Sequence, residues 1–197
     1  MKTTTLRKIE KCRPSKDMWD SLLEGLGKTE SDDEPLPYAR ILEIFGLDYA
    51  LWATRTETDF RWVQELAVAY ALRVNHLMRD PRSMSALEAA DLYLRGKKNK
   101  GNLYAQVDGA QEAYKDAVNE LYKKYLFERI ENWDAKPDFT HTSKAAAALY
   151  ATRSVLSENA SDSSDYAIFS SYSSCINFPP QGPELEWQEQ EFLRVVG

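Results

Sequence analysis

Apolar side chains recur at helical spacing along most of the chain. The strongest pattern covers residues 58–78, where apolar positions follow one another in steps of three and four and form one stripe. Asp80 and Pro81 interrupt it, because proline lacks the N–H that a continuing helix would use. The pattern therefore predicts an amphipathic helix over residues 58–78 and a new helix from Ser83 onward.

Other segments show the same periodicity together with start and stop signals. Ser15 or Asp17 is suited to cap a helix that Gly27 ends, and Gly46 stops a short helix before Asp48 opens another. We expect helices over residues 15–27, 38–45, 48 onward, 58–78, 83–94, 103–133, 145 onward, 165–176 and 184–196. Hairpin turns between alternating apolar residues are missing from the sequence. The prediction is an all-α fold, a multi-helix array or bundle of about seven to nine helices.

The C-terminal part has a less regular pattern than the rest. Serines interrupt the periodicity over residues 165–176, and prolines favour an extended or polyproline conformation over 178–183. We therefore expect a helical domain, residues 1–155. A less regular Ser-, Pro- and acid-rich extension, residues 156–197, is expected to pack on it.

The composition is typical of a globular protein. Of the 197 residues, 43% are hydrophobic and 28% are charged, and a chain of this length buries a core without metal or disulfide staples. There is no apolar run long enough to span a membrane, and the first residues lack the apolar stretch of a signal peptide. We expect a cytoplasmic protein in which Cys12 and Cys175 are free thiols.

The net charge of −6 is unevenly distributed. Residues 29–60 and 155–197 each carry a net charge of −6, whereas residues 1–28 and 61–154 each carry +3. Acidic surfaces repel phosphate backbones, so we expect no direct binding of nucleic acid. Two acidic regions suit a basic protein partner, including one that itself binds nucleic acid. The alternative is that these charges belong to solvated loops and helix faces.

The chain is rich in tyrosine and tryptophan, with eleven and five of them. Both types are enriched in binding hot spots, because they bury a large area and keep a polar group. Some lie among acidic residues of the C-terminal part, where packing of this part on its own domain is the alternative interpretation. The predicted partner-binding residues are Asp32, Asp33, Glu34, Tyr166, Tyr172, Glu184, Glu186, Trp187 and Glu189.

The sequence carries no recognisable signature of catalysis or of metal or cofactor binding. The chain has no Gly-rich phosphate loop, and His76 and His141 stand 65 positions apart without a metal-binding spacing. We predict no catalytic residue, no metal ligand and no cofactor. An enzyme with a site assembled from scattered residues, such as a hydrolase using a glutamate with His76 or His141, is an alternative.

One segment resembles a known family. Residues 46–55, G-L-D-Y-A-L-W-A-T-R, are similar to the G-L-D-D-A-L-W-x-L-R element of small helical immunity proteins found in bacteria and in bacteriophage genomes. Cys12, Trp19, a D-P-R helix start at residues 80–82 and alanine-containing helices agree with this resemblance, which covers roughly residues 10–120.

The resemblance implies a function, and the chain departs from the family in two places. The family name implies that the protein neutralises another protein by binding it. The chain has V-A-Y-A at residues 68–71, where family members often carry cysteine, and its part beyond residue 155 has no counterpart. For the shared segment itself we expect structural roles. Asp48 would cap the helix it opens, Trp52 would fill the core, and Arg55 would reach a carboxylate or a helix end.

Together these observations favour a non-enzymatic intracellular protein that binds another protein. With the resemblance, they predict a phage- or mobile-element-encoded inhibitor of a host or defence protein that acts through acidic, aromatic-rich surfaces. A structural or self-assembling phage accessory protein is the first alternative, since the alanines at residues 145–148 suit oligomerisation. The enzyme with scattered site residues is the second.

Overall fold

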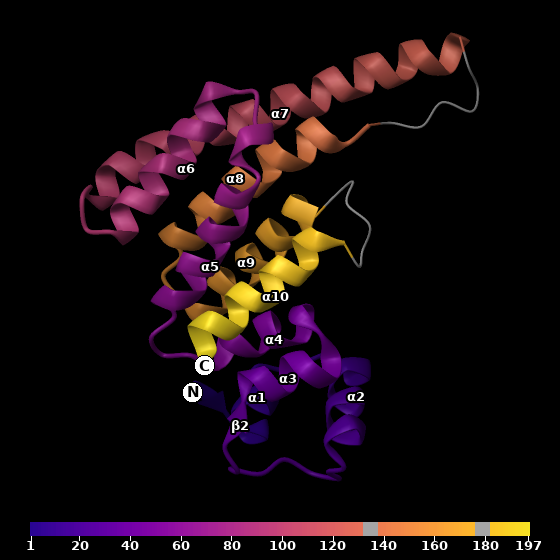
Figure 1. Ribbon diagram of the computed structural model, residues 1–197, viewed down its shortest axis with the longest axis vertical. Helices are drawn as coiled ribbons and strands as arrows, with labels where there is room; N and C mark the ends of the chain where they lie inside the picture. The colour runs from indigo at the N-terminus through magenta and orange to yellow at the C-terminus, as the bar shows by residue number, and fades with distance from the viewer. Residues whose placement is uncertain (132–137, 176–181) are drawn as a thin grey trace.

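The protein has the all-α fold that the sequence predicts. The computed structural model describes residues 1–131, 138–175 and 182–197 (Figure 1). Within these ranges it contains ten α-helices, two 3-10 helices and one pair of two-residue strands. The α-helices are α1 (Leu6–Lys11), α2 (Lys16–Leu26), α3 (Tyr38–Phe45), α4 (Leu47–Ala53), α5 (Arg61–Arg73), α6 (Pro81–Leu94), α7 (Lys100–Glu131), α8 (Thr140–Leu156), α9 (Ala160–Cys175) and α10 (Pro183–Val196).

The molecule is elongated, with α1 to α4 at one end and α6, α7 and the start of α8 at the other (Figure 1). The two chain ends lie side by side, because the Lys2 N–H donates to the Val196 carbonyl at 2.6 Å. Strand β1 (Thr3–Thr4) pairs antiparallel with β2 (Leu36–Pro37). These contacts fix the N-terminus against α10 and against the loop that precedes α3.

Several helix ends lie where the sequence signals place them. The Ser15 hydroxyl accepts the Met18 N–H at 3.3 Å and caps α2, and Gly27 ends this helix with a φ of 65°. Gly46, with a φ of 83°, separates α3 from α4. Both glycines are in the left-handed φ region, which disfavours residues with a Cβ. The short helix α1 was not expected, because six residues are too few to show a helical periodicity.

Helix α5 joins the two main hydrophobic clusters of the molecule. Val63 and Leu66 pack in a cluster with α1 to α4, α9 and α10, whereas Val68 and Ala71 pack in a second cluster with α6, α7 and α8. The helix predicted over residues 58–78 is shorter in the structure. A 3-10 turn, η2 (Asn75–Leu77), follows it. Because a 3-10 helix has three residues per turn, the apolar pattern continues past the end of α5.

Helices α8 and α9 pack against each other and against α5 through small residues. The Ser170 hydroxyl of α9 donates to the Ala67 carbonyl of α5 at 2.9 Å, and Ser154 and Ser163 share a hydrogen bond of 3.0 Å. These buried serines satisfy their hydroxyls on neighbouring helices. Helix α9 begins at Ala160 and not at the predicted Asp165, because the Asn159 side chain accepts the Asp162 N–H at 2.9 Å and caps the helix. The serines that weaken the sequence pattern here are part of the interior.

The C-terminal helices contribute to the core. Ala167 of α9 and Phe192 and Val196 of α10 belong to the first hydrophobic cluster. The end of the helix predicted to reach Trp133, and most of the extended segment predicted over residues 178–183, lie outside the described residues. Cys12 is a free cysteine. In the part of the chain that the structure describes, no helix is both long enough and apolar enough to cross a membrane.

Candidate functional site

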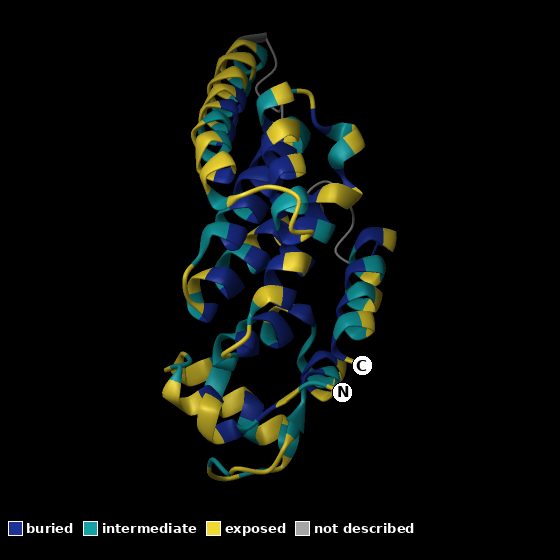
Figure 2. Ribbon diagram, turned by 90° about the vertical axis from the view of Figure 1, so that its left-hand side faces the viewer, coloured by how far each residue is buried: buried dark blue, intermediate teal, exposed yellow. Residues whose placement is uncertain are grey.

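The second half of α7 extends past the hydrophobic core. Between residues 118 and 129 no side chain of α7 is buried, and Tyr122, Leu126 and Phe127 expose 62%, 61% and 73% of their surface. Figures 1 and 2 show this half projecting beyond its neighbours with much of its surface exposed. Large apolar side chains gathered on one exposed helix are typical of a surface that another molecule covers.

An apolar groove of about 400 Å³ lies beside these side chains, between α7 and the start of α8. The pattern along α7 places Leu121 and Tyr125 on its buried side, but both are only half-buried and line this groove. The lining is entirely uncharged and consists of Tyr114, Val118, Leu121, Tyr122, Tyr125, Phe139 and Thr142. We call this lining together with Leu126 the α7 face.

A second cleft, of about 360 Å³, shares Leu121 and Thr142 with the groove. It brings together His76 and His141, the two histidines that are far apart in the sequence. The cleft forms where the segment after α5, the second half of α7 and the first turn of α8 meet. Its lining residues are His76, Leu77, Met78, Arg79, Ala117, Glu120, Leu121, Lys124, Asp138, Thr140, His141 and Thr142.

The polar groups of this histidine cleft are partly paired with one another. Asp138 accepts the Thr140 N–H at 2.9 Å and the Thr140 hydroxyl at 2.5 Å. These bonds, with help from the charges of Lys124 and Arg79, hold the pKa of Asp138 below its ordinary value. The Nδ1 atom of His141 is buried and has no hydrogen-bond partner among the described residues.

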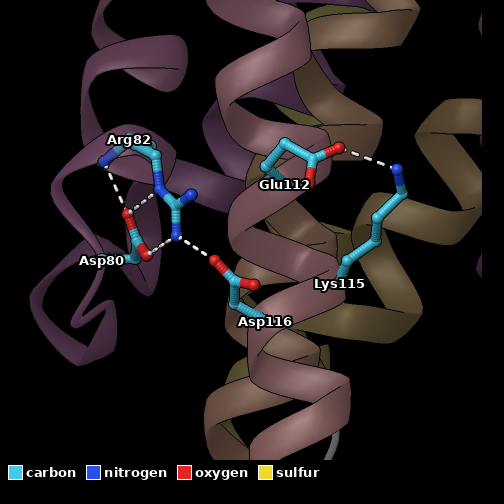
Figure 3. A network of polar contacts seen from close by, with 5 residues as sticks. All are labelled: Asp80, Arg82, Glu112, Lys115 and Asp116. Atoms are coloured by element: carbon cyan, nitrogen blue, oxygen red, sulfur yellow. Dashed lines mark hydrogen bonds and ion pairs between the residues drawn. The ribbon is translucent and has the colours of Figure 1, made fainter.

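An ion-pair network beside the cleft holds the start of α6 against α7 (Figure 3). The Arg82 guanidinium donates to Asp80 Oδ2 at 2.7 Å and to Asp116 Oδ2 at 2.6 Å. Asp80 is also the N-cap of α6, with its Oδ1 accepting the Arg82 N–H at 2.8 Å. Lys115 pairs with Glu112 at 2.7 Å on the same stretch of α7. The network connects the segment that carries His76 with the helix that forms the opposite wall of the cleft.

The segment of residues 46–55 lies away from both clefts and contacts α9. Arg55 forms an ion pair with Asp165, as expected for a side chain reaching a carboxylate, and stacks 4.9 Å from the Trp52 ring centre. Trp52 is only partly buried against the first cluster. Asp48 does not cap α4, because Gly46 occupies the N-cap position. The Asp48 carboxylate instead accepts a hydrogen bond from the Tyr172 hydroxyl.

The predicted acidic contact residues of the loop before α3 are engaged by basic neighbours. Lys28 donates to Asp32 at 2.7 Å and to Glu34 at 2.5 Å, and Arg7 pairs with Asp33 at 2.9 Å. The hydrogen bond from Lys28 lowers the pKa of Asp32. The side chains of Asp33 and Glu34 remain 72% and 69% exposed, so part of the negative charge still faces solvent.

Two of the predicted C-terminal contact residues are surface tyrosines of α9. Tyr172 is 51% exposed, and its hydrogen bond to Asp48 raises its pKa to about 12. Tyr166 is half-buried, with its ring centre 6.3 Å from that of Tyr150.

The remaining predicted contact residues lie on α10. Glu184 is only 5% exposed, and burial raises the pKa of its carboxyl, which lies 3.5 Å from Arg73. Trp187 packs half-buried against Arg73, with 5.2 Å between the guanidinium and the ring centre. Glu186 is exposed and Glu189 half-buried. The structure thus spreads the predicted contact residues over three places and does not gather them into one surface.

Neither feature around the second half of α7 is evident from the sequence pattern. Tyr122 and Leu126 fit a helical stripe, and the sequence does not show that the partner helix stops short of this stripe. The buried Lys144 was also missed; its Nζ donates to the Ser174 carbonyl at 2.6 Å. A lone lysine beside four alanines, residues 145–148, is the one signal that could have drawn attention to it.

The fold and these clefts define an all-α protein with an exposed apolar helix face and an adjoining histidine-lined cleft. No family model matches the chain, and neither a curated protein nor a solved structure shows significant similarity to it. Across residues 1–131, 138–175 and 182–197, no group of three or more His, Cys, Asp or Glu side chains is placed to hold a metal ion.

Proposed function

We propose that this protein acts by binding another protein through the α7 face. The observation that carries the proposal is the exposure of Tyr122 and Leu126, each above 60%, beside an uncharged groove of about 400 Å³. Tyrosine and large aliphatic side chains that become buried at an interface supply much of its binding free energy.

The expected partner inserts apolar side chains into this groove and is basic overall. The lining offers no charge to an incoming group, so charged side chains there would lose hydration without compensation. The net charge of −6 attracts a basic protein from a distance. The loop between α2 and α3, which carries Asp33 and Glu34, lies at the opposite end of the molecule from the second half of α7 (Figure 1). We therefore assign the contact to the α7 face and steering to the acidic residues.

The resemblance to immunity proteins extends the proposal to a biological role. Binding would inhibit the partner, a protein of the bacterial host or of its defence system, inside the host cytoplasm. In this role the chain is encoded by a phage or another mobile element. A defence nuclease with a basic groove is a partner of the right charge.

The test is capture of the partner from host extract by the immobilised protein and by matched variants. We expect the combined change Tyr122→Asp and Leu126→Asp to abolish capture, because it places charge on the apolar face. Tyr104→Asp, at a 51% exposed tyrosine nearer the start of α7, is the control and should leave capture intact. Far-UV circular dichroism checks that all variants remain helical. Equal capture by all three proteins would contradict the proposal.

The acidic residues are tested separately by their effect on kinetics. Reversing Asp33 and Glu34 to lysine should slow association and weaken its salt dependence while leaving dissociation unchanged. If a second copy of this chain is the occupant, light scattering of the purified protein shows a dimer that the Tyr122 and Leu126 changes disrupt. That result would replace the inhibitor proposal with the self-assembly alternative.

A further inference from the structure

One end of the α7 face is bordered by a half-buried arginine. Arg153 of α8 donates to the side chain of Gln111 on α7, and Gln111 lies three residues before Tyr114, where the lining of the groove begins. Residues three apart on a helix share one face, so Arg153 lies at the Tyr114 end of the groove. The lining itself is uncharged, and the guanidinium therefore places a permanent positive charge at one end of an apolar surface.

Aromatic rings continue the apolar surface past this arginine onto α9. Burial raises the pKa of the Tyr150 hydroxyl, and Tyr114 and Arg153 lie near enough to act on it in opposite directions. The ring centre of Tyr150 lies 5.1 Å from that of Phe169 and 6.3 Å from that of Tyr166. Phe169 is 48% exposed. The charge of Arg153 is thus flanked by apolar side chains of α7, α8 and α9.

Arg153 has no opposite charge to pair with. Within the described part of the chain, no carboxylate forms an ion pair with it. Of the acidic side chains of α9, Asp165 pairs with Arg55. Asp162 accepts a hydrogen bond from the Asn159 side-chain amide at 2.9 Å. The guanidinium of Arg153 is therefore bonded to a neutral amide, although acidic residues are present on the neighbouring helix.

Partial burial makes this unmatched charge a binding group. Arg13 also lacks an ion pair, but it is exposed and stays hydrated. Asp108, one turn before Gln111 on α7, is exposed and does not pair with Arg153 either. A half-buried guanidinium has lost part of its hydration, and a carboxylate that binds to two of its N–H groups compensates that loss. Such a carboxylate has to come from outside the described structure.

We infer that Arg153 pairs with a carboxylate of the partner protein, so that the segment filling the groove carries an aspartate or glutamate beside its apolar side chains. The inference rests on the proposed function, because it places this acidic group at the Tyr114 end of the same contact. The apolar groove alone does not distinguish the two directions in which a segment can lie along α7. A charge pair at one end fixes the direction, in a partner that is basic overall.

Phenylacetate is the probe, because it joins an aromatic ring to a carboxylate and requires no knowledge of the partner. Phenethylamine, with the same ring and the opposite charge, is the control at matched ionic strength. Binding to the full-length protein is followed by the NMR signal of the Arg153 Nε–H. We expect phenylacetate to shift this signal saturably and phenethylamine to leave it in place. The Nε–H of the exposed Arg13 should show no saturable shift with either compound.

Two arginines provide matched variants. Arg153→Gln removes the charge but keeps a hydrogen-bonding amide, and Arg13→Gln makes the same change at an exposed position. With binding followed on the ring signals of Tyr114 and Tyr150, we expect Arg153→Gln to weaken phenylacetate binding about fivefold and Arg13→Gln to leave it unchanged. Arg153→Lys keeps the charge and should retain part of the affinity. Far-UV circular dichroism checks that the variants remain helical.

Equal shifts with phenylacetate and phenethylamine, or full phenylacetate affinity in Arg153→Gln, would overturn the inference. Capture from host extract separates its failure from that of the proposed function. If Arg153→Gln captures the partner as well as the wild type does, while the Tyr122→Asp and Leu126→Asp protein captures nothing, the inference fails and the proposed function stands. Capture retained by the Tyr122→Asp and Leu126→Asp protein would contradict the proposed function, and this inference with it.

Discussion

Asp80 combines an N-cap and an ion pair in one carboxylate. It caps α6 and accepts three hydrogen bonds from Arg82, which lower its pKa below the ordinary value of 3.8. Because the pKa is lower in the folded than in the unfolded state, the stabilisation is present above pH 3.8. It is lost as the pH falls through the folded-state value.

We predict that Asp80→Asn lowers the free energy of unfolding at neutral pH by up to about 1 kcal/mol, because the ion pair is partly exposed. Asparagine retains the capping oxygen but cannot carry the charge. The difference between the two proteins should shrink as the pH falls below 3.8 and wild-type Asp80 becomes protonated. Urea unfolding at neutral and at acidic pH measures it, and a difference independent of pH would refute the assignment.

Lys144 is a fully buried cation whose hydrogen bonds are made to the end of α9. Its Nζ donates to the carbonyls of Ser173 and Ser174, at 3.3 and 2.6 Å. Lys144→Met preserves the length of the side chain but removes these donors. We predict a loss of about 1–3 kcal/mol in the free energy of unfolding. Lys123→Met, at an exposed position, is the control and should change it little. Similar small effects of both changes would show that α9 does not depend on Lys144.

At the scale of elements, the packing of α2 against α3 depends on a glycine. A Cβ on Gly25 would lie 2.5 Å from two ring atoms of Phe45 and 3.2 Å from Ile44. The Phe45 ring is itself stacked on Tyr49, with ring centres 5.5 Å apart, which restricts its movement. We predict that Gly25→Ala destabilises the protein by about 1–2 kcal/mol despite the higher helix propensity of alanine. Thermal unfolding provides the measurement.

At Gly109 of α7, the same change to alanine is expected to stabilise the protein. There a Cβ would meet Arg82 at 3.7 Å, an ordinary contact. Gly109→Ala should therefore stabilise the protein by up to about 1 kcal/mol through helix propensity alone. In a Phe45→Leu background, Gly25→Ala should also lose its cost. Destabilisation that persists there would assign the effect to something other than the Phe45 ring.

The boundaries of elements were predictable where a single residue decides them. Ser15, Gly27 and Gly46 act through their own side chain or backbone, so local sequence is enough. The cap assigned to Asp48 was wrong, because the backbone at Gly46 already starts the helix. The predicted reach of Arg55 to a carboxylate was correct, but the identity of Asp165 depends on how α9 packs.

For the whole molecule, α5 contributes side chains to both main hydrophobic clusters, so we expect the two clusters to unfold together. Trp62 belongs to the first cluster and Trp19, Trp52 and Trp187 pack against it, so tryptophan fluorescence mainly reports this cluster. Far-UV circular dichroism reports all the helices. We predict that both signals change in one coincident urea transition. A fluorescence change that precedes the loss of helicity would show instead that the cluster around α1 to α4 unfolds on its own.

The sequence alone determined the class of fold and the absence of a recognisable catalytic or metal-binding motif, because helical periodicity and motif spacing are local properties. It also indicated that tyrosine, tryptophan and acidic residues are numerous, but not which of them face solvent. Only the tertiary structure decided that Glu184 is buried, that Asp32 and Glu34 pair with Lys28, and that the second half of α7 extends past its neighbours. The tertiary structure also brings His76 and His141 together in one cleft. Burial and the meeting of distant side chains depend on where each helix ends relative to the helices packed on it, which no local pattern encodes.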